Sequence, residues 1–292
     1  MEPSTHFKDI TFVAFDLETT GLDPLSGDQI CEIGAVKFKD KEILGIFNQL
    51  VNPGCSISSE VSALTHITND MVAEAPPLKE VLPRFVEFIQ DTLLVAHNAP
   101  YDLSFLAVAF EKEKLTPTDN KTLDTLTLSR VLYPQYKHHN LDELRQRFNI
   151  THPQAHRGLG DALVTKDLFN IFLDKLQAEG IFTLGGLLKR HGPFYRFPLW
   201  ENQAFKRYPL DLIQGLRKAA QERRSVFIEY KSTKQKEKVG RLVDPYFFLK
   251  LDEQIYLKGY CHLRQEVRNF RLDRITKFEL MERTFKPKKD TD

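Results

Sequence analysis

The first half of the chain alternates between strand-like and helix-like hydrophobic patterns. Thr11–Glu18 is almost continuously apolar and predicts a buried strand. Gln29–Lys39 and Glu42–Val51 alternate well enough to predict two further strands, and Asp40-Lys41 between them predicts a hairpin turn. Thr92–His97 predicts a fourth strand.

Helical periodicity follows each group of strands. The predicted helices are Leu78–Gln90, Tyr101–Lys114, Asp124–Leu132, Leu141–Phe148 and Gly160–Leu176. Within the first of them, Pro83 predicts a kink or a break, because proline lacks the N–H that the helix needs. Strands followed by strand–helix alternation predict an α/β fold, a mixed sheet flanked by helices.

The pattern changes near Glu179. Residues 180–208 are rich in glycine and proline and predict a connector with some structure of its own. One amphipathic helix follows, with Leu212 and Leu216 on its apolar side, and short strands then dominate. The expected strands are Ser225–Lys231, Val239–Leu251, Gln254–Cys261, Glu266–Leu272 and Lys277–Arg283. The expected division is a domain over 1–178, a connector over 179–207 and a small β domain over 208–292.

Charge is distributed unevenly along the chain, although the net charge is only +1. Residues 1–175 hold 16 Lys+Arg and 25 Asp+Glu, a balance of −9, whereas residues 176–292 hold 25 and 15, a balance of +10. An acidic first half is compatible with a metal site, and a basic second half with a polyanionic partner. A solvated surface with scattered lysines explains the second half equally well.

Several classes of protein are excluded or disfavoured. No apolar run approaches the ~20 residues of a membrane helix, and the N-terminus lacks the features of a signal peptide, so we expect a cytoplasmic protein with no membrane partner. Cys31, Cys55 and Cys261 are odd in number and lack CxxC spacing, which predicts free thiols. The adjacent His138 and His139 predict a surface loop rather than a metal pair.

Four carboxylates fall on faces that should be buried. Strand alternation places Asp16 and Glu18 on the face of Phe12. Asp102 precedes an apolar stripe at i+3, i+4 and i+7, and Asp161 begins a similar stripe. Each acid alone has a plain alternative, a helix cap or a misplaced boundary.

Buried carboxylates are normally paired or bound to a metal. Four of them at one point would repel one another unless a cation held them, and hard oxygen ligands favour Mg²⁺ or Mn²⁺. Two such ions can activate a water and stabilise the leaving oxygen in a displacement at phosphorus.

Three segments resemble the exonuclease motifs of the DEDD superfamily. They are FDLETTGL at Phe15–Leu22, HNAPYDLSFL at His97–Leu106 and HRGLGDA at His156–Ala162. The histidine precedes Asp161 by five residues, as in the DEDDh branch, which includes the proofreading epsilon subunit of bacterial DNA polymerase III. Three motifs in this order are far more specific than a single DxE pair.

The resemblance spans roughly residues 8–176 and implies a ribonuclease-H-like fold that hydrolyses 3′-terminal nucleotides to 5′-mononucleotides. It implies two divalent ions, Mg²⁺ or Mn²⁺, held by Asp16, Glu18, Asp102 and Asp161. It makes His156 the general base, a role suited to a side chain with a pKa near neutrality. Substrate contacts are expected from Thr19, Thr20, His66 and Asn98, although Ile67 replaces the family's usual glycine after the histidine.

The C-terminal segment, roughly residues 208–284, resembles a WYL domain, a small SH3-like or Sm-like β-barrel. The resemblance rests on Arg241-Leu242-Val243-Asp244-Pro245, Ile255-Tyr256-Leu257 and Arg268-Asn269-Phe270-Arg271, with Ile255 in place of the name-giving tryptophan. It implies binding of nucleic acid or a small effector, for which Arg241, Tyr256, Arg268 and Arg271 are the candidates. The alternative is that tyrosines fill the core and arginines cover the surface.

The leading hypothesis is therefore a 3′→5′ exonuclease that trims DNA, with the β domain adding grip or control and a polymerase or DNA-repair partner. The same chemistry on RNA is a close alternative, because discrimination rests on contacts to the 2′-hydroxyl. Two other classes remain: a non-catalytic sensor on a nuclease fold, which the presence of all five catalytic side chains disfavours, and a polymerase accessory factor with a docking module.

Overall fold

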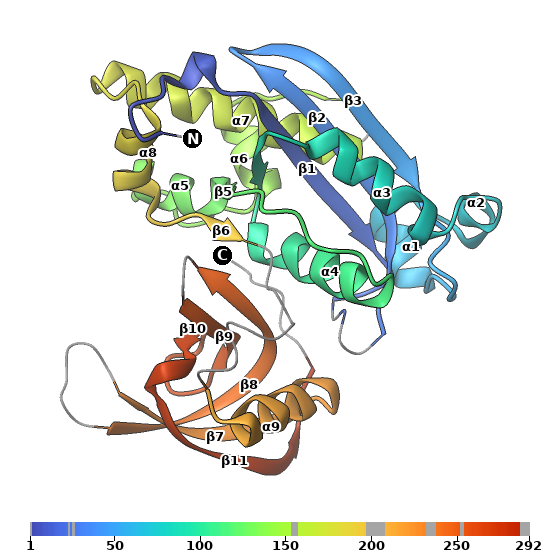
Figure 1. Cartoon of the computed structure of the whole chain (residues 1–292), viewed down its shortest axis with the longest axis vertical. Helices are drawn as coiled ribbons and strands as arrows, with labels where there is room; N and C mark the ends of the chain where they lie inside the picture. The colour runs from blue at the N-terminus through green and yellow to red at the C-terminus, as the bar shows by residue number, and fades with distance from the viewer. Residues whose placement is uncertain are drawn as a thin grey trace.

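The computed structural model describes residues 2–22, 24, 27–152, 157–196, 208–231, 238–251 and 254–286. Figure 1 shows a larger N-terminal part, in which helices cover a twisted sheet, and a smaller C-terminal part built mainly of strands. Among the described residues, no helix has the length and apolar character needed to cross a membrane. The three cysteines are free, as predicted.

The N-terminal part contains a mixed sheet, as predicted. Its strands are β1 (Phe12–Thr19), β2 (Ile30–Lys39), β3 (Glu42–Leu50), β4 (Leu93–Ala96) and β5 (Thr122–Asp124). Their spatial order is β5-β4-β1-β2-β3; β5, β4 and β1 run parallel, and β2 and β3 are antiparallel to their neighbours. Asp40 and Lys41 both adopt positive φ at the hairpin, as expected for a tight two-residue turn.

Helices cover both faces of this sheet. The helices of this part are α1 (Ser59–Thr65), α2 (Asn69–Ala73), α3 (Leu78–Ile89), α4 (Ala99–Lys112), α5 (Thr125–Leu132), α6 (Leu141–Arg147) and α7 (Gly158–Ala178), of which α3 to α7 contribute to the cores on the two faces. Phe15 and its neighbours on one face of β1 pack in a core with α3 and α4. Phe12 and Ala14 on the other face pack with α7. Alternation in β1 thus divides its side chains between two hydrophobic layers.

The structure differs from the sequence prediction at Pro83 and in several short elements. Helix α3 runs through Pro83 without a break. Pro83 lies on the exposed side of the helix, where water can satisfy the carbonyl that loses its partner. The short elements α1, α2 and β5 were not predicted, since three to seven residues are too few to show a clear period.

The connector is partly regular, as expected. It contains α8 (Leu184–His191) and strand β6 (Tyr195–Arg196). The C-terminal part follows with α9 (Leu210–Gln221), β7 (Arg224–Lys231), β8 (Lys238–Leu251), β9 (Gln254–Cys261), β10 (Glu266–Arg271), the 3-10 helix η3 (Leu272–Arg274) and β11 (Ile275–Thr284).

The five C-terminal strands form an antiparallel sheet in the order β10-β9-β8-β7-β11. In the described residues this sheet is not closed into the predicted barrel, since β10 and β11 are not paired with each other. Helix α9 packs on one face of this sheet, and its Leu212 and Leu216 share one core with Ile255 and Phe270. The apolar Ile255 therefore serves the core in the place of the family's tryptophan.

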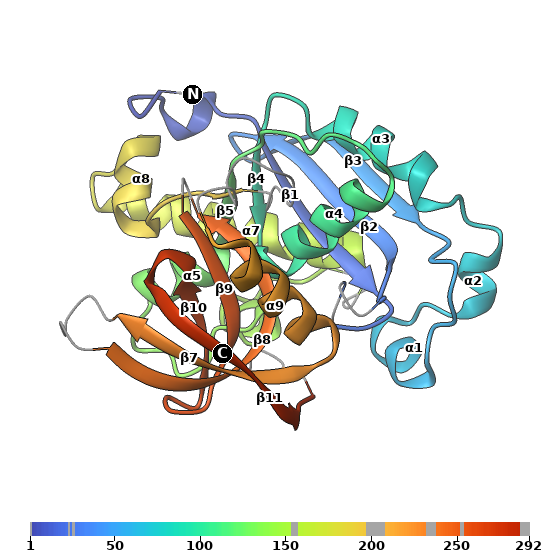
Figure 2. The same cartoon turned by 60° about the horizontal axis from the view of Figure 1, so that its bottom comes forward.

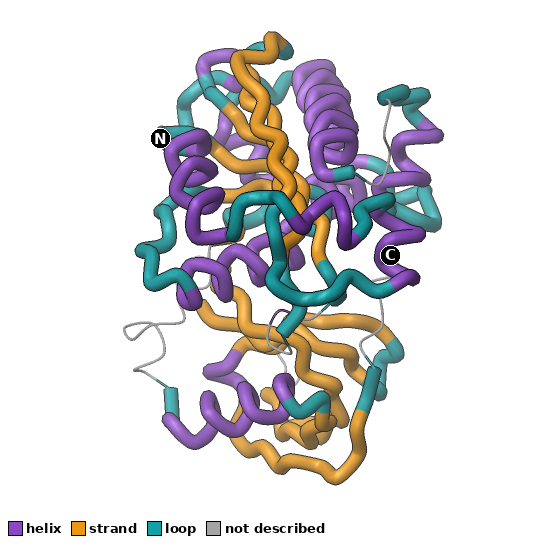
Figure 3. The backbone as a smooth tube through the Cα atoms, turned by 90° about the vertical axis from the view of Figure 1, so that its right-hand side faces the viewer, coloured by secondary structure: helices purple, strands orange, loops and turns teal. Residues whose placement is uncertain are grey.

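Strand β6 joins the two sheets. Tyr195 pairs with Thr122 of β5 on one side and with Leu251 of β8 on the other, so hydrogen bonding runs from β3 to β10. Figure 2 shows β5 and β8 approaching each other at this point, and Figure 3 shows strands of both parts following one another along the molecule. The two parts are thus connected by backbone pairing as well as by the chain itself.

Candidate active site

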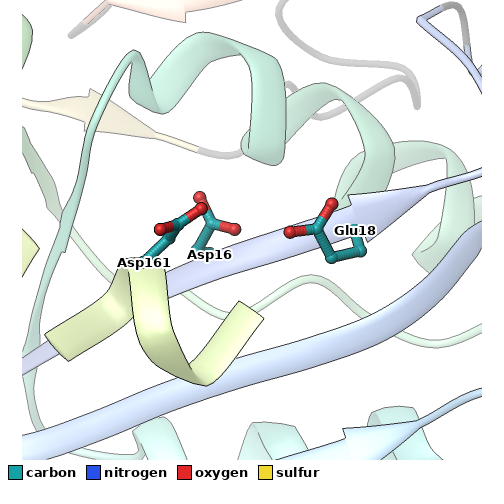
Figure 4. Close-up of side chains that lie close together, drawn as sticks. All are labelled: Asp16, Glu18 and Asp161. Atoms are coloured by element: carbon teal, nitrogen blue, oxygen red, sulfur yellow. The ribbon is translucent and has the colours of Figure 1, made fainter. Parts of the chain in front are cut away.

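Three carboxylates meet beside the carboxyl-terminal half of β1. Asp16 and Glu18 extend from β1 and Asp161 extends from the first turn of α7, and Figure 4 shows all three on the same side of the strand. One oxygen from each side chain lies within 4.8 Å of the other two. The alternation of β1 and the position of Asp161 in α7 bring these residues together, as the sequence predicted.

Asp102 lies next to this group, on the helix that packs against β1. It occupies the first turn of α4 and is only 2% exposed, and its Oδ1 accepts a hydrogen bond from the backbone N–H of Leu17 at 3.1 Å. That bond ties the start of α4 to β1 between Asp16 and Glu18. The apolar stripe predicted to follow Asp102 in α4 is present, since Phe105, Leu106 and Ala109 are all buried.

Burial and mutual repulsion disfavour the ionised form of these acids. Burial, followed by the charges of Asp102, Glu18 and Asp161, raises the pKa of Asp16 well above its usual value. Burial and then the charge of Asp161 raise the pKa of Glu18 to about 8. Burial also raises the pKa of Asp102 to about 8, against the lowering effect of its bond from Leu17. A cation bound to these oxygens would favour the ionised carboxylates and lower their pKa values.

These residues fit a divalent metal ion. Asp16, Glu18 and Asp161 offer the hard oxygen ligands that Mg²⁺ and Mn²⁺ prefer, and their spacing permits one ion to contact all three. Asp102 stands close enough to Asp16 to be the largest charge acting on it. The sequence-based expectation that Asp102 is also a ligand remains a prediction.

Glu32 on β2 is a site residue that the sequence analysis missed. It is 1% exposed and accepts two hydrogen bonds from Arg157, at 2.6 and 3.0 Å, and one from the N–H of Gly158 at 2.8 Å. Gly158 packs on Gly34, where an added Cβ would lie 1.9 Å from the Gly158 carbonyl carbon. This pairing fixes the start of α7, and therefore Asp161. An acid within an apolar strand was the available signal.

Asp124 was also missed, and it organises the start of α4. Its carboxylate is 2% exposed and accepts hydrogen bonds from the backbone N–H groups of Asn98, Ala99, Leu126 and Thr127 and from the Thr127 hydroxyl. It therefore caps α5 and holds the turn that leads into α4. Its position as the predicted first residue of a helix was a capping signal.

The two threonines that follow Glu18 support the chain around the site. The Thr19 hydroxyl donates to the Gly21 carbonyl at 2.6 Å and lies 2.7 Å from the Tyr101 hydroxyl. The Thr20 hydroxyl accepts the N–H of Gln29 at 2.9 Å. Thr19 is 6% exposed, so its hydroxyl is occupied within the protein. Contact of either residue with a nucleotide remains a prediction.

The remaining sequence candidates are distributed around this region. His66 is exposed at the end of α1, where its φ of 58° ends the helix. Asn98 is partly exposed just before α4 and likewise adopts a left-handed conformation, with φ 65°. His156, the expected general base, lies outside the described residues. Arg157 beside it is held by Glu32.

The expectation of a surface loop at His138-His139 is wrong for His139. His139 is 6% exposed, and its Nδ1 lies 3.0 Å from the Ser129 hydroxyl. The backbone carbonyl oxygen of His139 is 2.9 Å from Nε2 of His97. Burial lowers the pKa of His97 to about 4, which keeps its imidazole neutral. His97, His139 and Ser129 thus form a hydrogen-bonded network at the start of the segment His97–Leu106.

The C-terminal candidates lie on β8, β9 and β10. The Arg271 guanidinium makes two hydrogen bonds to Asp273, at 2.6 and 3.0 Å. Arg268 is exposed and pairs with Glu266, and Tyr256 is partly buried beside Arg271. Arg241 is partly exposed, with its Nε buried and without a hydrogen-bond partner among the described residues. Their ligand-binding roles stay predictions.

Comparison with known proteins identifies the class. An exonuclease family model matches residues 13–169, more than half of the chain, and a WYL domain model matches residues 211–280. The chain belongs to the exonuclease family and carries a WYL domain. Exonucleases of this family depend on divalent metal ions, and the cluster of Asp16, Glu18 and Asp161 fits such an ion.

Its relatives include proteins named for DNA polymerase III. The chain is 47% identical over 170 residues to "DNA polymerase III PolC-type" of Caldanaerobacter subterraneus subsp. tengcongensis, covering 58% of this chain and 12% of that protein. It is 43% identical over 196 residues to a "DNA polymerase III subunit epsilon-like protein" of Rhodobacter capsulatus, covering 64% and 27%. The chain thus spans about an eighth and a quarter of these proteins.

A solved structure extends the likeness in fold beyond the nuclease part. E. coli exonuclease I in complex with a dA16 oligonucleotide matches with a TM-score of 0.53 and 16% identity. The match covers 86% of this chain and 55% of that one. Such coverage must include part of the C-terminal half.

Proposed function

We propose that the protein is a 3′→5′ exonuclease that removes mononucleotides from DNA with two divalent cations. The observation that carries this proposal is the convergence of Asp16, Glu18 and Asp161 within 4.8 Å, with the buried Asp102 bonded to the backbone of Leu17 between the first two. Bound Mg²⁺ or Mn²⁺ would activate the attacking water and stabilise the leaving oxygen. Asp16, Glu18, Asp102 and Asp161 would hold the ions.

The protein's own groups supply the rest of the chemistry in this proposal. His156 takes a proton from the attacking water as the general base. Arg157, the next residue along the chain, is held by Glu32. Thr19, Thr20, His66 and Asn98 contact the 3′-terminal nucleotide, and the buried Asp124 keeps Asn98 at its place before α4.

DNA is the proposed polymer because the relatives bear the names of DNA polymerase III proteins and exonuclease I was solved with a DNA oligonucleotide. The same relatives make a polymerase or repair assembly the proposed partner. Recovery of such a partner by affinity purification of the tagged chain would support this proposal, and failure to recover one would count against it.

We also propose that the WYL domain binds nucleic acid or a small anionic effector. Arg241, Arg268 and Arg271 would hold phosphates and Tyr256 would stack on a base. Support comes from the excess of ten positive charges in residues 176–292. Because Arg271 already pairs with Asp273, a phosphate would have to displace that carboxylate. Arg241→Ala and Arg271→Ala should each weaken DNA binding in a salt-dependent manner.

The decisive experiment uses single-stranded DNA and RNA of the same sequence, labelled at the 5′ end, with Mg²⁺, Mn²⁺ or EDTA. A metal-dependent ladder that shortens from the 3′ end is expected, faster on DNA, and a phosphorothioate at the 3′ terminus should slow it. Asp16→Asn and His156→Ala should remove it. Faster loss of RNA would make the protein an exoribonuclease, and no degradation of either polymer would overturn the enzyme proposal.

A further inference from the structure

The C-terminal domain packs against the helix that carries Asp102. Ala107 of α4 is 1% exposed and belongs to the same hydrophobic core as Leu216 of α9 and Val243 of β8. Figure 1 shows α4 between the N-terminal sheet and the C-terminal strands. The WYL domain therefore meets the nuclease through an element of the active site rather than through a remote surface.

One polar contact reaches further toward the site. Lys258 on β9 is only 8% exposed, and its Nζ donates to Oδ1 of Asn98 at 3.3 Å. Lysine is rarely buried to this degree, because its ammonium group loses water on burial. A buried lysine that crosses between two domains to a motif residue indicates a specific structural task.

Asn98 is held from two directions. Its backbone N–H donates to Asp124 at 2.8 Å, while its side chain accepts from Lys258. Its φ of 65° and ψ of 47° place it in the left-handed region, which residues other than glycine occupy only when their surroundings impose it. Asn98 directly precedes the first turn of α4, and that turn contains Asp102.

We propose that Lys258 is a positioning residue of the exonuclease site. By holding Asn98, it sets the direction in which α4 begins and therefore the position of Asp102 behind Asp16 and Glu18. The WYL domain is then a part of the nuclease framework, in addition to any ligand it binds. This inference rests on the metal-dependent activity proposed above.

The test compares Lys258→Met with Lys258→Arg and Lys277→Met. Methionine keeps an unbranched apolar stem and removes the ammonium donor, whereas arginine keeps a charged donor. Lys277 is an exposed lysine on β11 of the same domain and serves as the matched control. Each full-length variant is measured for kcat and KM on single-stranded DNA, for the Mn²⁺ concentration giving half-maximal rate, and for Tm.

We expect Lys258→Met to lower kcat about 10- to 100-fold, the range typical of residues that orient metal ligands, and to raise the half-saturating Mn²⁺ concentration. KM should change little, Lys258→Arg should recover most of kcat, and Lys277→Met should match the wild type. An unchanged kcat in Lys258→Met would overturn the proposal. So would a raised KM with kcat intact, since that pattern indicates loss of substrate binding alone.

Asn98→Gly gives a second test, which removes the acceptor of the contact and leaves Lys258 in place. Glycine favours the left-handed conformation and removes the acceptor for Lys258. If Lys258 acts through Asn98, combining Lys258→Met with Asn98→Gly should add no further loss of kcat. Full additivity of the two losses would overturn the proposal.

Calorimetric titration of Mn²⁺ into the wild type and Lys258→Met distinguishes failure of the positioning role from failure of the proposed exonuclease function. A wild type that binds Mn²⁺ but degrades no polymer would refute the proposed function, while weaker Mn²⁺ binding by Lys258→Met would still support the positioning role. Equal Mn²⁺ affinity of the two proteins in that case would refute the positioning role as well.

Discussion

Carboxylates that are buried or partly buried occur in two contrasting surroundings in the nuclease domain. Around Glu32 and Asp124, donors from Arg157, backbone amides and a threonine hydroxyl approach the oxygens. Around Asp16 and Glu18, the neighbouring groups with the largest electrostatic effect are other carboxylates. The first surrounding satisfies an anion and holds helices in place, while the second leaves the anions in need of a cation.

The largest expected effect comes from removing one of the crowded acids. Asp16→Asn should lower exonuclease activity by at least about 10³-fold, more than the 10- to 100-fold loss typical of residues that only orient ligands. The same change should raise the metal-free free energy of unfolding by roughly 1–2 kcal/mol, because it removes repulsion. Activity assays and urea unfolding in EDTA test both effects. If Asp16→Asn destabilised the metal-free protein, Asp16 would be stabilised by its neighbours rather than repelled by them.

Removing a satisfied acid should do the opposite. Glu32→Gln removes the charged acceptor that the partly exposed Arg157 and the Gly158 N–H share, and should cost about 1.5–3 kcal/mol of unfolding free energy. It should also lower kcat about 10- to 100-fold, because the start of α7 is loosened. Glu143→Gln breaks the exposed pair with Arg147 and is the control, with an expected cost below about 0.5 kcal/mol. Equal costs for the two variants, measured by urea unfolding, would refute this assignment.

The free energy of unfolding should fall at low pH because of His97, which lies in the hydrogen-bonded network just before α4. The pKa of His97 is lowered to about 4, so the unfolded chain takes up a proton at a higher pH than the folded protein does. Stability from this residue is complete above pH 6.5 and is lost as the pH falls toward 4, by on the order of 3 kcal/mol. Unfolding measured between pH 7 and 4 should show this loss, and His97→Gln should show less of it. An equal loss in the variant would exclude His97 as the cause.

A smaller effect should appear when metal and pH are varied together. The raised pKa values of Glu18 and Asp102, both about 8, mean that the metal-free folded protein loses stability as the pH rises from about 4 to about 8. Mn²⁺ at about 100 times its Kd should restore roughly 2.7 kcal/mol. Tm should therefore respond to Mn²⁺ more at pH 8 than at pH 5. The same response at both values would show that the ion does not compete with these protons.

The sequence predicted the site residues that obey a local period. Asp16 and Glu18 were found because strand alternation fixes their face, and Asp102 and Asp161 because each begins a buried helical stripe. Glu32 obeys the same alternation, but its partner Arg157 is far along the chain. The contact of Lys258 with Asn98 spans 160 positions and two domains, and no local pattern encodes such a distance.

Errors in the fold prediction have a similar origin. Helix α3 continues through Pro83 because that residue faces solvent, a circumstance that propensity alone does not include. His139 was assigned to a surface loop because two adjacent histidines do not face one another, whereas in the structure it contacts the Ser129 hydroxyl and the Tyr136 carbonyl. The open C-terminal sheet depends on where α9 packs, which is settled by the tertiary core rather than by strand patterns.

The two-residue strand β6 has a consequence for anyone who divides this chain. A fragment that ends before Tyr195 leaves β5 with an uncovered edge, and a fragment that begins after Arg196 does the same to the end of β8. Uncovered edges offer unpaired N–H and C=O groups to other chains, so separately expressed halves are exposed to self-association through strand pairing. Such fragments would need Tyr195 and Arg196 retained, or a charged residue placed along the exposed strand.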